Sequence, residues 1–152
     1  VEIYSKTLES LGQDPLPDYK EPAESPVSTP DLAEKYPLIL TTGARLPVYH
    51  HTWLRNIPWL QEIEPHPRIE INPKTAAQLK VDDGDRVTVE SPRGSITARA
   101  KLLPGLHPRV AAMAHGWPDP SNPNMLTDHV NRDPIFGSTP LKSILCRVQK
   151  IQ

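Results

Sequence analysis

The sequence predicts a mainly β protein, a small closed barrel with short helical insertions that follows an extended N-terminal arm. About six or seven short apolar or alternating segments follow one another beyond position 36, and alternation with period two is typical of half-buried strands. Turn residues separate these segments, and a strong helix start signal occurs once. Prolines are frequent, 19 in 152 residues, and those before position 38 favour an extended chain. By strand count alone, an OB-fold or an SH3-like barrel suits the pattern equally well.

Residues 1–35 are expected to form the arm, and residues 36–152 the barrel domain. Residues 1–5 alternate like a short strand, residues 6–11 suit one helical turn, and an acidic, proline-rich run begins at Asp14. Two interpretations stay open, a linker from a preceding domain and an arm that packs across a neighbouring domain. Because the chain has no initiator Met, we expect it to be a segment of a longer polypeptide.

The barrel domain begins with a strand and a mixed segment. Residues 37–42 form an apolar run that ends at Gly43, which predicts a buried strand and a turn. Residues 50–64 have helix-like apolar spacing interrupted by Pro58, which predicts one short helix.

A second strand is expected at residues 68–71. Asn72 and Pro73 follow it and predict a helix through residue 79, because Asn is a good N-cap and Pro suits the first helical position. The acidic residues around Gly84 then predict a tight turn in which Asp side chains accept hydrogen bonds from backbone N–H groups.

The second half of the domain is expected to be strand-rich. Residues 86–91 and 95–103 read as a hairpin, with Val87 and Val89 facing inward. Residues 110–114 and the alternating residues 143–151 complete the strand set.

Composition excludes several kinds of site. A net charge of −1 gives no global field for nucleic acid or a membrane surface, so any anion must be bound by local geometry. No apolar run approaches the roughly 20 residues that span a bilayer. The single Cys146 excludes a disulfide framework and an iron–sulfur cluster within this chain, and the histidine spacing does not suit zinc.

Four segments, taken in order, carry a family resemblance. They are residues 41–45 leading into His50 and His51, residues 68–73, residues 81–94, and residues 115–117 followed by 122–127. Together they resemble the C-terminal cofactor-binding domain of molybdopterin oxidoreductases, the family of dimethyl sulfoxide reductase, formate dehydrogenase and periplasmic nitrate reductase. The resemblance covers roughly residues 36 to 150 and implies a six-stranded double-psi β-barrel.

The resemblance implies that the domain binds a molybdopterin guanine dinucleotide cofactor. The turn at Thr42, Gly43 and Arg45 would contact the pterin and phosphate end, because an arginine fork suits phosphate. Asn124 would contact the pterin edge, since an amide offers two donors and an acceptor. The full set of expected cofactor-binding residues is Thr42, Gly43, Arg45, His50, His51, Asn56, Glu70, Asn72, Asn124, Leu126, Thr127 and Lys142.

Within that set, Glu70 and Asn72 are expected near guanine, and Lys142 near a phosphate. Simpler explanations exist for several residues of the full set: an ordinary turn for Thr42 to Arg45, a helix cap for Asn72 and a solvated lysine for Lys142. Neither a catalytic residue nor a metal ligand is expected in this chain.

The resemblance also implies a larger enzyme. The molybdenum or tungsten ion and any iron–sulfur cluster would be held by upstream domains of the same catalytic subunit, so this chain alone should be inert. An iron–sulfur electron-transfer subunit is a further expected partner, and the compartment is the cytoplasm or periplasm of a prokaryote. Two alternatives stay open: a separate barrel subunit, as in formylmethanofuran dehydrogenases, and a protein-recognition barrel without cofactor, as in the N-domains of AAA ATPases.

Overall fold

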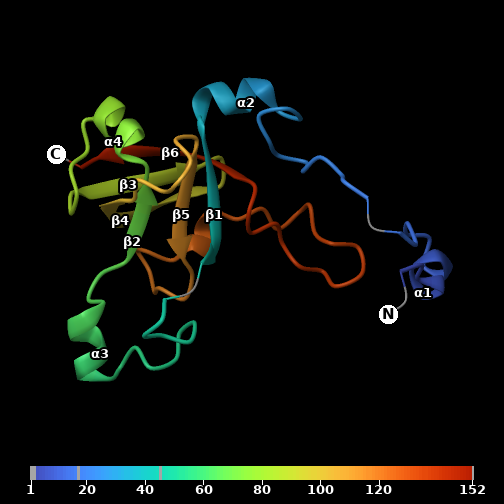
Figure 1. The fold of residues 1–152 in the computed structure, drawn as a ribbon, viewed down its shortest axis with the longest axis horizontal. Coiled ribbons are helices and arrows are strands. Elements are labelled where there is room, and N and C mark those ends of the chain that lie inside the picture. Colours follow the sequence, from blue (N-terminus) through green and yellow to red (C-terminus); the bar gives the residue numbers. More distant parts are fainter. Residues whose placement is uncertain (1–2, 17, 45, 152) are drawn as a thin grey trace.

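Six strands close into one barrel in the order β1-β5-β2-β4-β3-β6 in the computed structural model, which describes residues 3–16, 18–44 and 46–151 (Figure 1). The β1–β5 and β2–β4 pairs are parallel, and the other four pairs are antiparallel. The strands are β1 (Leu38–Ala44), β2 (Arg68–Ile71), β3 (Arg86–Ser91), β4 (Gly94–Leu102), β5 (Val110–Ala114) and β6 (Ile144–Lys150). The predicted mainly β, double-psi barrel with short helices is confirmed.

The core lies inside the barrel and follows the period-two pattern of the sequence. Val87 and Val89 of β3 point inward and are fully buried, as predicted. Leu40 of β1 and Ile69 and Ile71 of β2 occupy equivalent inward positions and are also fully buried. Each such side chain contributes about 1.5–3 kcal/mol by leaving water, so the strands specify the barrel through their apolar face.

Two helices lie where the sequence predicts them. Helix α4 (Pro73–Leu79) begins after Asn72, whose side chain accepts a hydrogen bond from the backbone N–H of Lys74 at 2.8 Å. Helix α3 (Pro58–Ile63) occupies the end of the mixed segment. Pro58 does not interrupt this helix but begins it, because the first helical position needs no hydrogen-bonded N–H.

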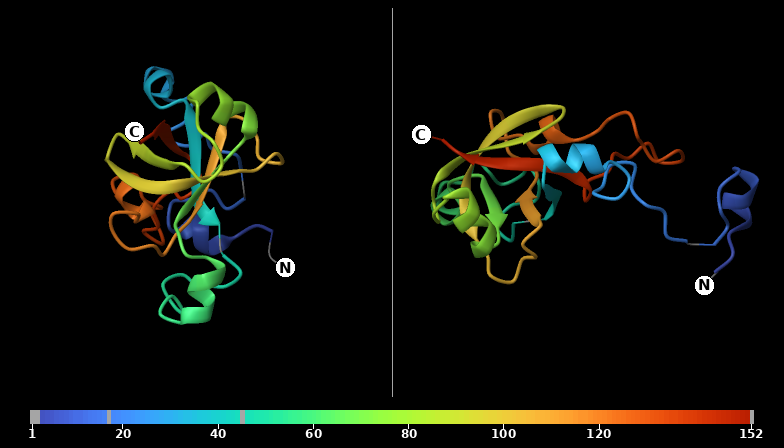
Figure 2. Two further views of the ribbon diagram at one scale, coloured as in Figure 1. Left: turned by 90° about the vertical axis from the view of Figure 1, so that its left-hand side faces the viewer. Right: turned by 90° about the horizontal axis from the view of Figure 1, so that it is seen from above.

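The arm contains more helix than expected. Helix α1 (Lys6–Ser10) confirms the predicted turn of helix, but Ser5 caps it instead of belonging to a strand. Helix α2 (Pro30–Lys35) replaces the extended chain expected there, with Pro30 at its first position. Figures 1 and 2 show α1 at the far end of the arm, away from the barrel, and α2 beside β6. Among the described residues, no helix is long and apolar enough to cross a bilayer.

The last strand departs from simple alternation. Ile144, Cys146 and Val148 are buried, as alternation of the strand allows, but Leu145 on the other face is fully buried too. The arm explains the difference, because the carboxylate of Glu24 accepts a hydrogen bond from the backbone N–H of Leu145 at 2.6 Å. The start of β6 is therefore covered by the arm as well as by the barrel.

Candidate functional site

The parallel pairing of β1 and β5 brings two distant turns together. Gly43 and Ala44 both pair with Ala114, and the register shifts between them. The chain that follows β1 and the chain that follows β5 therefore leave the barrel side by side at one end, here named the β1–β5 end (Figure 1). Arg45, expected at this turn, lies outside the described residues.

A chain of hydrogen bonds joins these two turns. Nδ1 of His115 lies 2.9 Å from the carbonyl oxygen of Thr42, and its Nε2 contacts Nδ1 of His51. Because a carbonyl oxygen only accepts, Nδ1 of His115 carries the proton, and in the neutral ring Nε2 accepts from His51. Thr42 is itself buried, and its N–H donates to the carbonyl of Leu141 at 2.8 Å.

Gly116 lets the two turns approach closely. Its φ is +88°, and a Cβ there would lie 2.5 Å from the carbonyl carbon and 2.6 Å from the carbonyl oxygen of His51. Both conditions favour glycine, the first by backbone conformation and the second by space. His51 also has a positive φ, 56°. The close approach thus depends on one residue without a side chain.

Arg55 lies between two aromatic rings beside this contact. Its guanidinium carbon is 3.8 Å from the centroid of the Trp117 ring and 4.4 Å from that of Tyr49. It donates to the carbonyl oxygens of His51 at 3.1 Å and His115 at 3.3 Å. Burial lowers the pKa of Arg55. Arg55 therefore connects the two turns by stacking and by hydrogen bonds.

Two buried donor atoms at this place have no hydrogen-bond partner among the described residues, Nη1 of Arg55 and Nε1 of Trp117. Neither Arg55 nor His115 is among the site residues predicted from the sequence. The motif at residues 115–117 was a visible signal for His115, but the sequence carries no signal that pairs Arg55 with it.

Lys142 lies at the same end of the barrel. Its Cε would be 3.6 Å from a Cβ at Gly43, and the lysine is exposed. It stands just before β6, whose first residue, Ile144, pairs with Leu40 of β1. An exposed ammonium group beside a glycine backbone can receive an anionic group.

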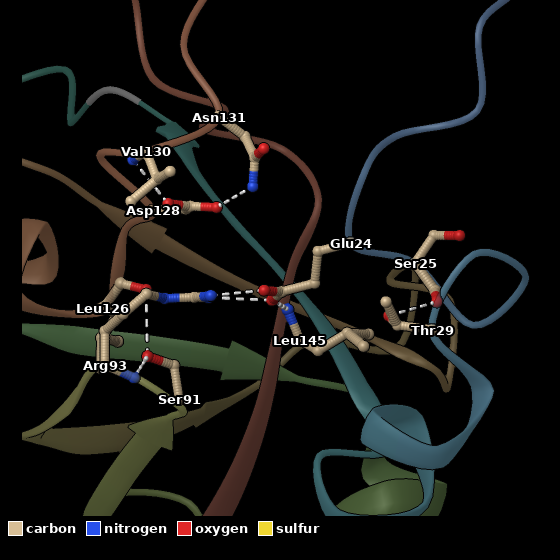
Figure 3. Close-up of polar contacts among 10 residues, drawn as sticks. All are labelled: Glu24, Ser25, Thr29, Ser91, Arg93, Leu126, Asp128, Val130, Asn131 and Leu145. Atoms are coloured by element: carbon tan, nitrogen blue, oxygen red, sulfur yellow. Dashed lines mark hydrogen bonds and ion pairs between the residues drawn. The ribbon is translucent and has the colours of Figure 1, made fainter.

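The short helix η1 (Pro123–Leu126) holds the other expected pterin-side residues. Asn124 is exposed, whereas the Leu126 side chain is fully buried in the core, so only its backbone is available for contacts. The carbonyl of Leu126 accepts from Ser91 Oγ at 3.0 Å and from Arg93 Nε at 3.1 Å (Figure 3). Thr127 Oγ1 donates to the carbonyl of Asn124 at 2.9 Å.

The remaining expected residues lie apart from this cluster or at its edge. His50 is exposed, with its ring centroid 4.7 Å from that of His51, and Asn56 is exposed before α3. Glu70 is half-buried on β2, and Asn72 begins α4 at the other end of the barrel, since Ile71 pairs with Ala111. The Asn72 amide nitrogen donates to the carbonyl of Leu106 at 2.6 Å, so this side chain is engaged on both sides.

Comparison with known proteins identifies the family. Residues 38–145 match the family of the molydopterin dinucleotide binding domain. The chain belongs to this family. The dopamine dehydroxylase of Eggerthella lenta is 38% identical over 165 residues, which cover 98% of this chain and 16% of that protein. The formate dehydrogenase subunit alpha of Megalodesulfovibrio gigas is 31% identical over 172 residues, covering 90% of this chain and 17% of that protein.

A solved structure shows the same fold. Acetylene hydratase from Pelobacter acetylenicus superposes with a TM-score of 0.89 at 31% identity, over 99% of this chain and 23% of that one. This molydopterin dinucleotide binding domain thus spans less than a quarter of the proteins that it resembles. Family membership supports cofactor binding over a protein-recognition barrel and over a separate barrel subunit.

Proposed function

We propose that the domain binds molybdopterin guanine dinucleotide at the β1–β5 end of the barrel. The observation that carries the proposal is the convergence there of segments that are far apart in sequence. Thr42 and Gly43 lie near the end of β1, His115 follows β5, and Lys142 precedes β6. Asn124 belongs to the same end, because Ser91, which bonds to Leu126, ends β3 beside the start of β6.

The chemistry of these groups suits the cofactor. A dinucleotide with a diphosphate and a pterin offers mainly hydrogen-bond acceptors and negative charge. The proposed site offers the ammonium of Lys142 and the amide of Asn124, and further donors from Arg55 and Trp117 lack a partner in the described residues. Charge-assisted bonds to phosphate are the strongest of these contacts. Arg45 belongs to the proposed set by its place directly after this turn.

The guanosine end is proposed to lie toward Glu70, as the resemblance implies. A carboxylate can accept from the Watson–Crick edge of guanine. Asn72 is less available for this role, because its amide already caps α4 and bonds to Leu106. His50, His51, Asn56 and Thr127 remain proposed contacts of the pterin half.

We infer that the domain works within a larger catalytic subunit whose other domains hold the molybdenum or tungsten ion and any iron–sulfur cluster. The support is the chain's coverage of 16–17% of its relatives. Large apolar side chains are exposed along the arm and in two segments of the barrel domain, as expected for surfaces that other domains cover. The two segments of the barrel domain contain Trp53, Leu54, Trp59 and Ile63 around α3, and Val130, Ile135, Phe136 and Leu141 in the loop before β6.

Binding of extracted cofactor by the 152-residue chain tests the proposal. Cofactor from a purified molybdopterin oxidoreductase is titrated anaerobically while the tryptophan fluorescence is followed. Lys142→Ala and Asn124→Ala should each raise the dissociation constant about fivefold or more, since each removes a contact of about 1 kcal/mol or more. Lys74→Ala, an exposed position on α4, is the control and should change it less than twofold. Equal affinities in all four proteins would contradict the proposed site.

A further inference from the structure

The carboxylate of Glu24 joins the N-terminal arm to the barrel next to the proposed site. Figure 3 shows this carboxylate between the β3–β4 turn, the segment after η1 and the start of β6. It pairs with the guanidinium of Arg93 through Nη1 and, at 2.9 Å, through Nη2. It also accepts the backbone N–H of Leu145 at 2.6 Å. One arm residue thus contacts two separate segments of the barrel.

The Glu24–Arg93 pair is shielded from solvent. The Glu24 side chain is 12% exposed and the Arg93 side chain 21% exposed, so the ion pair is largely buried. The arm is therefore packed against the barrel at this point. Ion pairs that are bidentate and largely desolvated fix geometry more strongly than exposed ones. The hydrogen bond from Arg93 to Glu24 raises the pKa of Arg93.

Arg93 transmits this contact to the pterin-side segment. While two of its nitrogens face Glu24, its Nε donates to the carbonyl of Leu126 at 3.1 Å. Ser91 Oγ donates to the same carbonyl at 3.0 Å and accepts the N–H of Arg93 at 3.2 Å. Two donors from the β3–β4 turn therefore fix the end of η1, on which Asn124 and Thr127 stand.

A second carboxylate lies near Arg93. Asp128 lies close enough to contribute to the pKa of Arg93, and its oxygens accept from the N–H of Val130 at 2.7 Å and from Asn131 at 2.5 Å. Asp128 acts on the guanidinium only through its charge, whereas Glu24 bonds to it directly, so among the described residues Glu24 is the carboxylate that orients Arg93.

We propose that Glu24 is a positioning residue for the cofactor site, because it orients Arg93 and so holds η1 and Asn124 in place. The inference rests on the proposed function for its binding consequence. Docking of the arm and the geometry of the site are then coupled, so a displacement of residues 18–29 by a neighbouring domain would change cofactor affinity.

The chain offers a matched control pair. Arg147 and Glu90 also form a bidentate ion pair, with Nη2–Oε1 at 2.9 Å and Nε–Oε2 at 3.1 Å. They join β6 to β3 directly and are 40% and 27% exposed. Glu90→Gln therefore removes the same charge from the same kind of pair without acting on the Leu126 carbonyl.

The test compares Glu24→Gln with Glu90→Gln in the 152-residue chain. Glutamine keeps the size of the side chain and one acceptor oxygen, and thermal unfolding checks that both variants fold. Amide hydrogen exchange is measured first, without ligand. In Glu24→Gln, the amides of Met125, Thr127 and Leu145 should exchange about tenfold faster, as expected when a charge-assisted hydrogen bond is lost. In Glu90→Gln they should exchange as in the parent. Arg93→Lys should show the same faster exchange as Glu24→Gln. A lysine ammonium group lacks the planar guanidinium and cannot bond to Glu24 and to the Leu126 carbonyl in the same way.

Binding of extracted cofactor is measured second and separates the two proposals. We expect Glu24→Gln to raise the dissociation constant about fivefold or more, and Glu90→Gln to leave it within twofold. Unchanged exchange in Glu24→Gln overturns the inference, as does faster exchange with an unchanged dissociation constant. A third outcome is faster exchange in Glu24→Gln together with a parent chain that binds no cofactor. This outcome overturns the proposed function and supports the positioning of η1 by Glu24.

Discussion

His51 and His115 are hydrogen-bonded to each other across 64 positions of sequence, with ring centroids 4.4 Å apart. The second bond of His115, to the Thr42 carbonyl, fixes the direction of the first. The turn after β1 and the turn after β5 are consequently held as one unit. Four predictions follow from the residues that support this unit and the barrel around it.

Gly116→Ala should separate the two histidines. The new methyl group would overlap the carbonyl of His51, and the backbone has a φ of +88°. We expect a loss of about 2 kcal/mol or more in the free energy of unfolding, together with new NMR signals for both imidazole rings. Gly105→Ala is the control, because a Cβ there meets nothing within 4 Å. Equal stability of the two variants would contradict the close approach.

Arg55→Ala should destabilise the protein by about 2–4 kcal/mol, since it removes the stack between Tyr49 and Trp117 and two bonds to backbone carbonyls. Arg55→Lys should recover only part of this, because lysine keeps the charge and lacks the planar fork. Urea unfolding measures both. Arg86→Ala, at an exposed position of β3, should change stability by less than about 0.5 kcal/mol; a similar small change for Arg55→Ala would refute the role given to it.

Asn72→Ala should lower stability without lowering affinity for guanosine diphosphate. It loses the helix cap and the bond to Leu106, which together are worth about 2–3 kcal/mol. Asn72→Asp keeps the capping oxygen and isolates the contribution of the amide. A weaker affinity for guanosine diphosphate with unchanged stability would instead show that Asn72 recognises guanine.

Cys146 should make the barrel less stable in alkali. Burial raises the pKa of its thiol to about 12 in the folded protein, against about 8.5 in an unfolded chain. The neutral thiol therefore stabilises the fold fully below pH ~8.5, and this contribution is lost as the pH rises toward 12, by up to about 1.4 kcal/mol per pH unit.

Urea unfolding of the parent and of Cys146→Ala between pH 7 and 11 tests this, with the difference between the two slopes as the quantity of interest. A thiol reagent at pH 8 should modify Cys146 only after unfolding. Rapid modification of the folded protein would show that Cys146 is accessible.

Local signals in the sequence were sufficient for much of the fold. Asn72 and Pro73 specify the start of α4 by themselves, and alternation at Val87 and Val89 specifies which face of β3 is inward. The burial of Leu145 does not follow from alternation, because alternation describes one strand and not the arm that covers it. The helix α2 was missed because proline favours both an extended chain and a first helical turn.

The candidate site could be predicted only in pieces. Its segments were visible as motifs, but their meeting depends on the register of β1 against β5, which no local pattern encodes. Arg55 bonds to the carbonyl of His115, and Glu24 forms an ion pair with Arg93. Both partners are far away in sequence, so neither Arg55 nor Glu24 can be recognised as a site residue from its local sequence. The separation of Asn72 from His115 likewise follows from strand order.

The most direct test of the central claim is a map of cofactor-induced NMR shifts in the 152-residue chain. Extracted cofactor should shift the amides of Thr42, Gly43, His51 and Asn124 and the imidazole signals of His115, while Lys74 and Asp83, at the other end of the barrel, stay unchanged. Shifts confined to α4 and the acidic turn, or none at cofactor concentrations that saturate an intact enzyme of the family, would contradict binding at the β1–β5 end.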